Sequence, residues 1–164
     1  MPIIKKNSSC LITRTNRHGF TLIEVLITLS IVGIMASIAY PSYRESIIKG
    51  RRADAQGALA SFANAMSQWY VENNSSYLGA AGTVDAPEDT GTPHIFAANA
   101  PITGETPIYT LSIENATDST FTLRATPTGV QSGDGFLEIN ELGEKFWDKN
   151  DNGIIDDGLG ENGW

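Results

Sequence analysis

Cysteine is nearly absent from this chain of 164 residues, which contains only Cys10. A single cysteine excludes any intramolecular disulfide bond, although disulfides commonly stabilise small domains outside the cell. Basic side chains are also scarce after residue 19, where 7 lysines and arginines stand against 19 aspartates and glutamates. Such an acidic body makes nucleic acid an unlikely partner, because nucleic-acid binding depends on lysine and arginine neutralising phosphates.

Motifs of catalysis are missing from the sequence as well. The two histidines, His18 and His94, lie far apart, and no serine or threonine stands in a nucleophile motif. No glycine-rich loop of the phosphate-binding type occurs. We therefore expect a protein that is not an enzyme.

One long apolar run dominates the first third of the chain. Residues 20–40 carry a single charge, Glu24, and a helix of this length spans about 31 Å, roughly the hydrocarbon thickness of a bilayer. The 19 residues before it contain four basic side chains and no acid. This asymmetry predicts a cytoplasmic leader, residues 1–19, followed by a membrane-spanning helix over 20–42.

The helical pattern continues beyond Pro41 and becomes one-sided. Residues 73–76 then form a polar stop. We expect one helix over about 21–72, kinked near Pro41, whose second half must pack against another element. The apolar face of that half consists of Ile48, Ala55, Leu59, Phe62, Met66, Trp69 and Tyr70.

The rest of the chain changes from helical to alternating periodicity. Residues 75–106 are rich in glycine, proline and threonine and predict a connecting loop. Apolar and polar residues then alternate over 108–113 and 121–126, and shorter runs follow over 136–140 and 144–147. These patterns predict an α+β fold, in which a four-stranded antiparallel sheet over about 107–147 covers the second half of the helix.

The start of the apolar helix resembles the processing junction of the type IV pilin family. The resemblance rests on Gly19, Phe20, Thr21, Leu22, Ile23 and Glu24, followed by the long apolar run. It implies that prepilin peptidase removes the leader between Gly19 and Phe20, and that Phe20 becomes an N-methylated amino terminus. It also implies the pilin fold, with a soluble head over 43–164, and places Pro41 where family members often break the helix in the filament.

Glu24 is costly in an apolar span, by about 3 kcal/mol on insertion scales, and such residues are usually functional. After cleavage it could pair with the new amino group of Phe20, either on its own subunit or on a neighbour. A pairing between subunits would set the register of assembly. The plainer alternative is a charge tolerated near a helix end, where it reaches the interface.

The acidic C-terminal region, residues 148–164, resembles the first half of an EF-hand or dockerin calcium loop. Oxygen-bearing side chains alternate before Gly153, as a loop converging on a hard cation requires. The twelfth position holds Leu159 instead of an acid, so Asp157 or Glu161 would have to substitute. A solvated, turn-rich tail without metal is the alternative. The expected calcium ligands are Asp148, Asn150, Asn152, Ile154 through its carbonyl, Asp156 and Asp157.

The favoured function is that of a structural subunit, which polymerises with copies of itself into an extracellular type IV pilus. The resemblance implies a precursor in the inner membrane of a Gram-negative bacterium, where it meets the peptidase and the pilus assembly machinery. A major pseudopilin of type II secretion, forming a short periplasmic filament, is the first alternative. A minor pilin acting in adhesion or DNA uptake is the second.

Overall fold

The computed structural model describes residues 19–103, 106–156, 158 and 160–164. The leader expected over 1–19 therefore lies outside the described residues except for Gly19, and so does the expected calcium ligand Asp157. The chain divides into two compact units, which meet between Pro41 and Ser42.

The predicted long helix is confirmed as α1, Leu22–Glu72, which begins in the first unit and ends in the second. Pro41 lies inside it, and the helix continues through this residue. A proline has no N–H, so α1 lacks one backbone hydrogen bond at this position.

The first unit contains the apolar half of α1. Every side chain from residue 19 to residue 40 is exposed. Among the described residues, α1 is the helix that is long and apolar enough to cross a membrane. The sequence pattern over 20–40 predicted this property.

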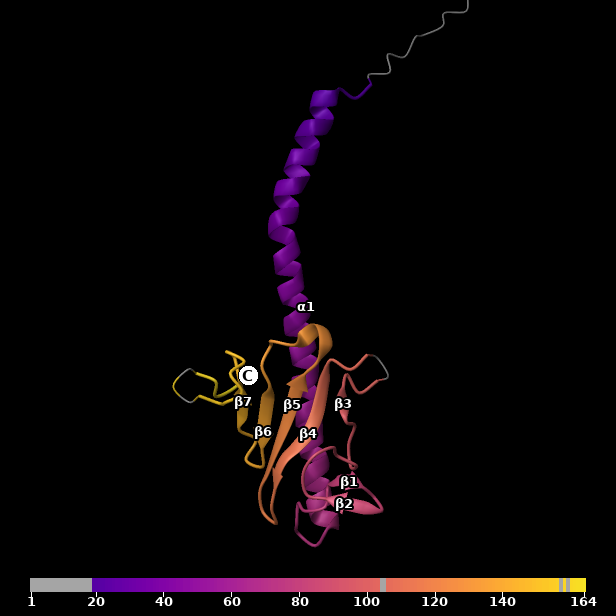
Figure 1. Ribbon diagram of the computed structural model, residues 1–164, viewed down its shortest axis with the longest axis vertical. Coiled ribbons are helices and arrows are strands. Elements are labelled where there is room, and N and C mark those ends of the chain that lie inside the picture. The colour runs from indigo at the N-terminus through magenta and orange to yellow at the C-terminus, as the bar shows by residue number, and fades with distance from the viewer. Residues whose placement is uncertain (1–18, 104–105, 157, 159) are drawn as a thin grey trace, which may run out of the picture. The chain divides into compact units, whose positions relative to one another are not determined.

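The second unit contains a five-stranded antiparallel sheet in the order β3-β4-β5-β6-β7 (Figure 1). Its four longer strands are the predicted ones, and β3 adds a short edge strand. The fold is therefore α+β, as expected from the change in periodicity. The strands are β3 Asn99–Ala100, β4 Tyr109–Ala116, β5 Phe121–Pro127, β6 Leu137–Asn140 and β7 Lys145–Trp147.

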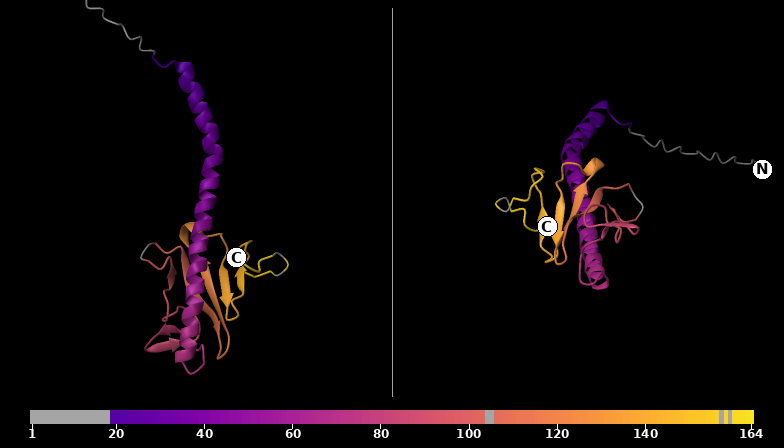
Figure 2. Two further views of the ribbon diagram at one scale, coloured as in Figure 1. Left: turned by 180° about the vertical axis from the view of Figure 1, so that it is seen from behind. Right: turned by 60° about the horizontal axis from the view of Figure 1, so that its bottom comes forward.

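One face of this sheet lies against the second half of α1, as the view from behind shows (Figure 2). Alternation along β4 and β5 sends every other side chain into the core. From the helix, Leu59 and Phe62 are fully buried, and the Phe62 ring stacks on Phe96 with centroids 5.1 Å apart. The core comprises mainly Ala55, Leu59, Phe62 and Met66 of α1 with Tyr109, Leu111, Ile113, Leu123, Leu137 and Ile139 of the sheet.

The region 75–106 contains more regular structure than a plain loop. A small hairpin joins β1, Ala81–Thr83, to β2, Ala86–Glu88. These two strands have three residues each and lie in a stretch rich in glycine, proline and threonine, so they show too little alternation to be found by pattern. A single 3-10 turn, η1, Gly129–Gln131, lies between β5 and β6.

The C-terminal residues fold back beside β7. The Trp147 N–H donates to the carbonyl of Glu161 at 2.9 Å, and the indole of Trp164 donates to the carbonyl of Glu138 at 3.3 Å. Gly135 lies against this region with a φ of +71°, and a Cβ atom at this position would lie 1.6 Å from the carbonyl oxygen of Asp148. Glycine is required there because both the backbone conformation and the space exclude a side chain.

Candidate functional site

Helix α1 begins with a side-chain cap at Thr21. The Thr21 carbonyl accepts the backbone N–H groups of Glu24 and Val25 at 3.1 and 3.3 Å, and its hydroxyl accepts the Glu24 N–H at 3.3 Å. Threonine followed three residues later by glutamate is the signature of a capping box. The cap satisfies backbone donors that would otherwise be unpaired at the end of a helix.

Glu24 lies in the first turn of α1, where the positive end of the helix dipole favours a negative charge. Phe20 precedes the cap by one residue, and its side chain is 83% exposed. Gly19 is exposed as well. Gly19, Phe20 and Glu24 therefore lie within six positions at one helix end, whereas Pro41, also expected to act in assembly, lies inside α1.

The residues that follow this helix end form an exposed apolar surface, whose contact with water is unfavourable. Leu22, Ile34 and Ile38 are each at least 65% exposed, and the residues between them are exposed too. Exposed apolar patches of this extent mark contacts with lipid or with another protein.

The C-terminal loop is organised by two carboxylates with no exposed surface. Asp148 accepts the N–H of Asn152 at 3.1 Å on one oxygen and the N–H of Gly153 at 2.8 Å on the other. Glu161 accepts the N–H groups of Lys149 and Asp156 at 3.1 and 2.7 Å. Four backbone donors of one loop are thus held by two buried acids.

The other oxygen side chains of this loop alternate as the sequence indicated. Asn150 accepts the N–H of Asn152 at 3.0 Å, and Asn152 accepts the N–H of Ile154 at 2.9 Å. The Asn152 amide also donates to Asp156 at 2.9 Å. Gly153 turns the chain with a φ of +83°. The loop thereby keeps these oxygens close to one stretch of backbone.

In the described part of the chain, no group of three or more histidine, cysteine, aspartate or glutamate side chains is arranged to hold a metal ion. The ion pairs found among these residues include neither Asp148 nor Glu161. Buried carboxylates are usually paired with a cation or bound to a metal. The oxygens of the loop are the ligand type that calcium prefers, although in the described residues the oxygens of Asp148 and Glu161 accept backbone N–H groups.

A second buried charge lies between α1 and the segment after η1. Asp134 accepts from Arg52 through both Nε, at 2.9 Å, and Nη2, from the Tyr109 hydroxyl at 2.6 Å, and from the Gln131 amide at 3.0 Å. The Arg52 guanidinium lies 3.6 Å from the centre of the Trp147 ring, whose indole N–H donates to the carbonyl of Asp134 at 2.7 Å. The network joins the helix, strands β4 and β7 of the sheet, and the segment around η1.

The surroundings of Asp134 and Tyr109 change the pKa values of both side chains. Burial alone would raise the pKa of Asp134, but hydrogen bonds from Arg52, Tyr109 and Gln131 and the Arg52 charge outweigh it and lower that pKa. Burial, together with the hydrogen bond to Asp134, raises the pKa of Tyr109 far above its ordinary value. Asp134 is therefore ionised and Tyr109 is protonated at neutral pH.

The basic side chains of the second unit are largely engaged within the protein. Arg124 pairs with Glu114 at 3.2 Å and with Glu138 at 2.8 Å. Lys49 pairs with Glu45 at 2.8 Å, and Arg52 is held by Asp134. The amino groups of Lys145 and Lys149 lie 4.3 and 5.6 Å from the ring centres of Trp164 and Trp147. Within the described residues this leaves Arg44 and Arg51 outside such contacts.

Three features of these sites were not predicted from the sequence. The cap at Thr21 had a readable signal, since threonine stands three residues before Glu24. Glu161 was named only as a substitute ligand, yet it is fully buried in the loop. The partnership of Arg52 and Asp134 had no signal, because the two residues are 82 positions apart.

Two family models match the chain. Residues 41–135 match the model described as type IV minor pilin ComP, DNA uptake sequence receptor. Residues 14–40 match the model described as prokaryotic N-terminal methylation motif.

Several characterised proteins resemble part of the chain. Fimbrial protein Q of Moraxella bovis is 40% identical over 75 residues, which are 46% of this chain and 47% of that protein. Fimbrial protein EcpC of Eikenella corrodens is 32% identical over 74 residues, 42% and 48% of the two chains. The type IV major pilin protein PilE1 of Neisseria gonorrhoeae is 33% identical over 81 residues, 46% and 47%. The chain spans about half the length of the curated relatives it matches.

Proposed function

This chain belongs to the type IV pilin family described by the ComP minor pilin model, and we propose that it is a structural subunit of a type IV pilus. Pilins are structural proteins and not an enzyme family, in line with the absence of catalytic motifs in the sequence. The observation that carries the proposal is the apolar half of α1, whose side chains are all exposed.

The apolar half-helix can be covered in two ways. A bilayer covers it in the precursor, because residues 22–40 have the length and composition of a membrane span. The same half-helices of other subunits cover it in a filament, since lipid and apolar helices are equivalent surroundings for these side chains. Assembly then exchanges one apolar environment for another.

Glu24 is proposed to give this exchange its register. A carboxylate surrounded by apolar helices needs a partner, and a methylated amino group at Phe20 of a neighbouring subunit would supply one. Pro41, where α1 lacks a backbone hydrogen bond, is proposed as the position at which the helix yields during assembly.

The role of Glu24 can be tested with Glu24→Gln, which removes the charge and keeps the shape. We expect normal amounts of subunit in the inner membrane but few sheared surface filaments on electron microscopy. Glu45→Gln, which removes a charge outside the apolar span of the same helix, should leave filaments normal. Normal filaments from the Glu24 variant would refute the proposed role.

Processing is a separate part of the proposal. Mass spectrometry of the mature subunit should find a chain that begins with N-methylated Phe20, because the family match includes the N-terminal methylation motif. Gly19→Val should accumulate the precursor, since a branched side chain would obstruct the peptidase. A mature chain that begins elsewhere would contradict this part.

We further propose that calcium stabilises the C-terminal loop. Asp148, Asn150, Asn152 and Asp156 would hold it, with the carbonyl of Ile154. Glu161 or Asp157 would take the place of the missing acid at Leu159. The buried charges of Asp148 and Glu161 support this, because a cation would neutralise them. Such a loop would also be compatible with the alternative function, that of a type II secretion pseudopilin.

Thermal melts with calcium and then with chelator test the calcium proposal. We expect a higher Tm with calcium in the natural chain, because calcium binds only the folded loop. Asp156→Asn should remove that shift, whereas Asp151→Asn, outside the alternating set, should keep it. Equal melts with calcium and chelator would rule out the site.

Reception of DNA is a second candidate function, which the ComP description of the matching model favours. Against it, five of the seven basic side chains of the second unit are engaged with acids or aromatic rings among the described residues. Fluorescence anisotropy with short DNA duplexes at low and high salt decides between the two. Tight binding that prefers one DNA sequence would establish that the chain is a DNA receptor. We expect no such sequence-specific binding.

A further inference from the structure

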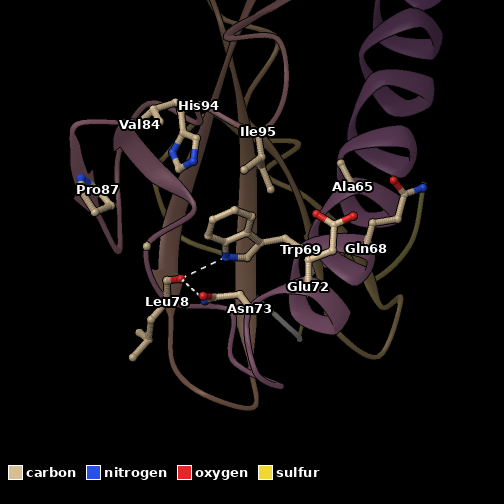
Figure 3. A pocket seen from close by; sticks show the side chains of 11 residues that line it. Ala65, Gln68, Trp69, Glu72, Asn73, Leu78, Val84, Pro87, His94 and Ile95 are labelled. Carbon is tan, nitrogen blue, oxygen red and sulfur yellow. Dashed lines mark hydrogen bonds between the residues drawn. The ribbon is translucent and has the colours of Figure 1, made fainter.

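A cavity of about 530 Å³ opens beside the C-terminal end of helix α1 (Figure 3). The last turns of the helix form one wall, and hairpin β1–β2 and residues 94–95 form others. Its volume lies in the range of small-molecule sites, about 300–1,000 Å³. Pilus assembly as proposed above gives this cavity no role.

The middle of the cavity is aromatic and apolar. The indole of Trp69 lies in the centre of the lining side chains, between Ile95 on one side and the backbone carbonyl of Leu78 on the other (Figure 3). The His94 ring meets the indole edge-on, with centroids 5.4 Å apart. An apolar stem of a ligand would replace water against these rings.

Apart from the amide of Gln68, the polar side-chain atoms that remain available in the cavity are acceptors. The Trp69 indole N–H is already used, because it donates to the Leu78 carbonyl at 3.0 Å. The Asn73 amide nitrogen donates to the carbonyls of Ser76 and Leu78 at 3.2 and 2.9 Å, which orients its oxygen as the remaining acceptor. Nδ1 of His94 lies 3.1 Å from the Ala81 carbonyl, so it must donate, and Nε2 of the neutral ring is an acceptor.

The charges around these acceptors favour a cationic ligand. The exposed carboxylate of Glu72 lines the cavity, and no arginine or lysine is part of the lining. The unit around it, residues 42–164, has 18 acidic and 7 basic side chains. Such an excess attracts cations to clefts that share its sign.

We propose that this cavity binds an alkylammonium group, a cationic amine head on a short apolar stem. The head lies between the Glu72 carboxylate, the Asn73 oxygen and the electron-rich indole of Trp69, which attracts cations through its ring. The stem contacts Ile95 and the aromatic rings. A ligand that is only apolar leaves the acceptors unmatched, and an anion is repelled by Glu72.

The test uses the full chain in a non-ionic detergent and calorimetric titration with butylammonium. We expect saturable binding in the millimolar range or tighter. Butanol and butyrate have the same stem without the cation, and each should bind at least fivefold more weakly. Equal affinity for butanol, tighter binding of a neutral monosaccharide such as galactose, or no saturation by butylammonium would overturn the proposal.

Variants connect the binding to these residues. Glu72→Gln should weaken butylammonium binding about fivefold, a typical effect of removing one partly solvated charge. Glu45→Gln removes the same charge about 40 Å away along α1 and should change nothing. Equal weakening by both variants would reduce the effect to overall charge and refute the site. Trp69→Phe should weaken binding while keeping an aromatic ring in the core.

The amine could belong to a free molecule or to a lysine side chain of a partner protein. Titration with Nα-acetyl-lysine methylamide, which carries the butylammonium head on a peptide backbone, separates these sources. Binding comparable to butylammonium identifies a lysine side chain as a ligand that fits. Binding of butylammonium alone identifies a free amine, and both results support the site.

Discussion

Replacing Asp134 by Asn tests the buried network that joins α1 to the sheet. The variant keeps the shape and one acceptor oxygen but removes the charge that faces Arg52. The two side chains are only 8% and 15% exposed, so the arginine would keep a buried charge without its partner. Breaking such a pair costs about 3–5 kcal/mol, and we expect about 3 kcal/mol because an acceptor remains.

The assay is thermal unfolding of the full chain in a non-ionic detergent. At this chain length, about 3 kcal/mol corresponds to a Tm lower by roughly 9 °C. Intrinsic tryptophan fluorescence, to which Trp147 beside Arg52 contributes, should follow the same transition. Glu45→Gln breaks the pair with Lys49, whose side chains are 64–66% exposed, and should cost less than about 0.5 kcal/mol. If the two variants melt alike, the network does not stabilise the fold.

Acid should remove the same stabilisation in the natural chain. The pKa of Asp134 is lowered in the folded state from its ordinary value of 3.8, so the unfolded chain binds the proton at a higher pH. The contribution is therefore complete above about pH 4 and is lost as the pH falls through the lowered pKa. The Tm difference between the natural chain and Asp134→Asn should shrink on acidification below pH 4. A constant difference would contradict this reasoning.

Two further variants test the core and one close backbone approach. Phe62→Ala removes a fully buried ring and should lower the free energy of unfolding by about 3–5 kcal/mol, whereas Val71→Ala, 79% exposed on the same helix, should change it by less than about 0.5 kcal/mol in denaturant titrations. Gly135→Ala would place a Cβ atom against the backbone of Asp148 and should destabilise far more than Gly143→Ala. Gly143 also has a positive φ, of +76°, but has open space around it, so equal Tm values for the two would exclude the proposed overlap.

The sequence by itself determined the long helix and the character of its two halves. An unbroken apolar run and a one-sided pattern are local properties, and they predicted 21–72 against the observed Leu22–Glu72. Strands β4, β5 and β6 followed for the same reason, since alternation is visible within each of them, and β7 followed from the short run after the Gly143 turn. The junction at residues 19–24 likewise pointed to the pilin family, which the family models confirm.

Only the tertiary structure decided which distant residues meet. Arg52 and Asp134 are 82 positions apart, and no local pattern marks either as a partner. Glu161 carries no periodic signal, yet the fold buries it where it holds the N–H groups of Lys149 and Asp156. The cavity at Trp69 arises because hairpin β1–β2 lies beside the end of α1. Periodicity specifies which face of an element is apolar, whereas packing of separate elements determines what that face meets.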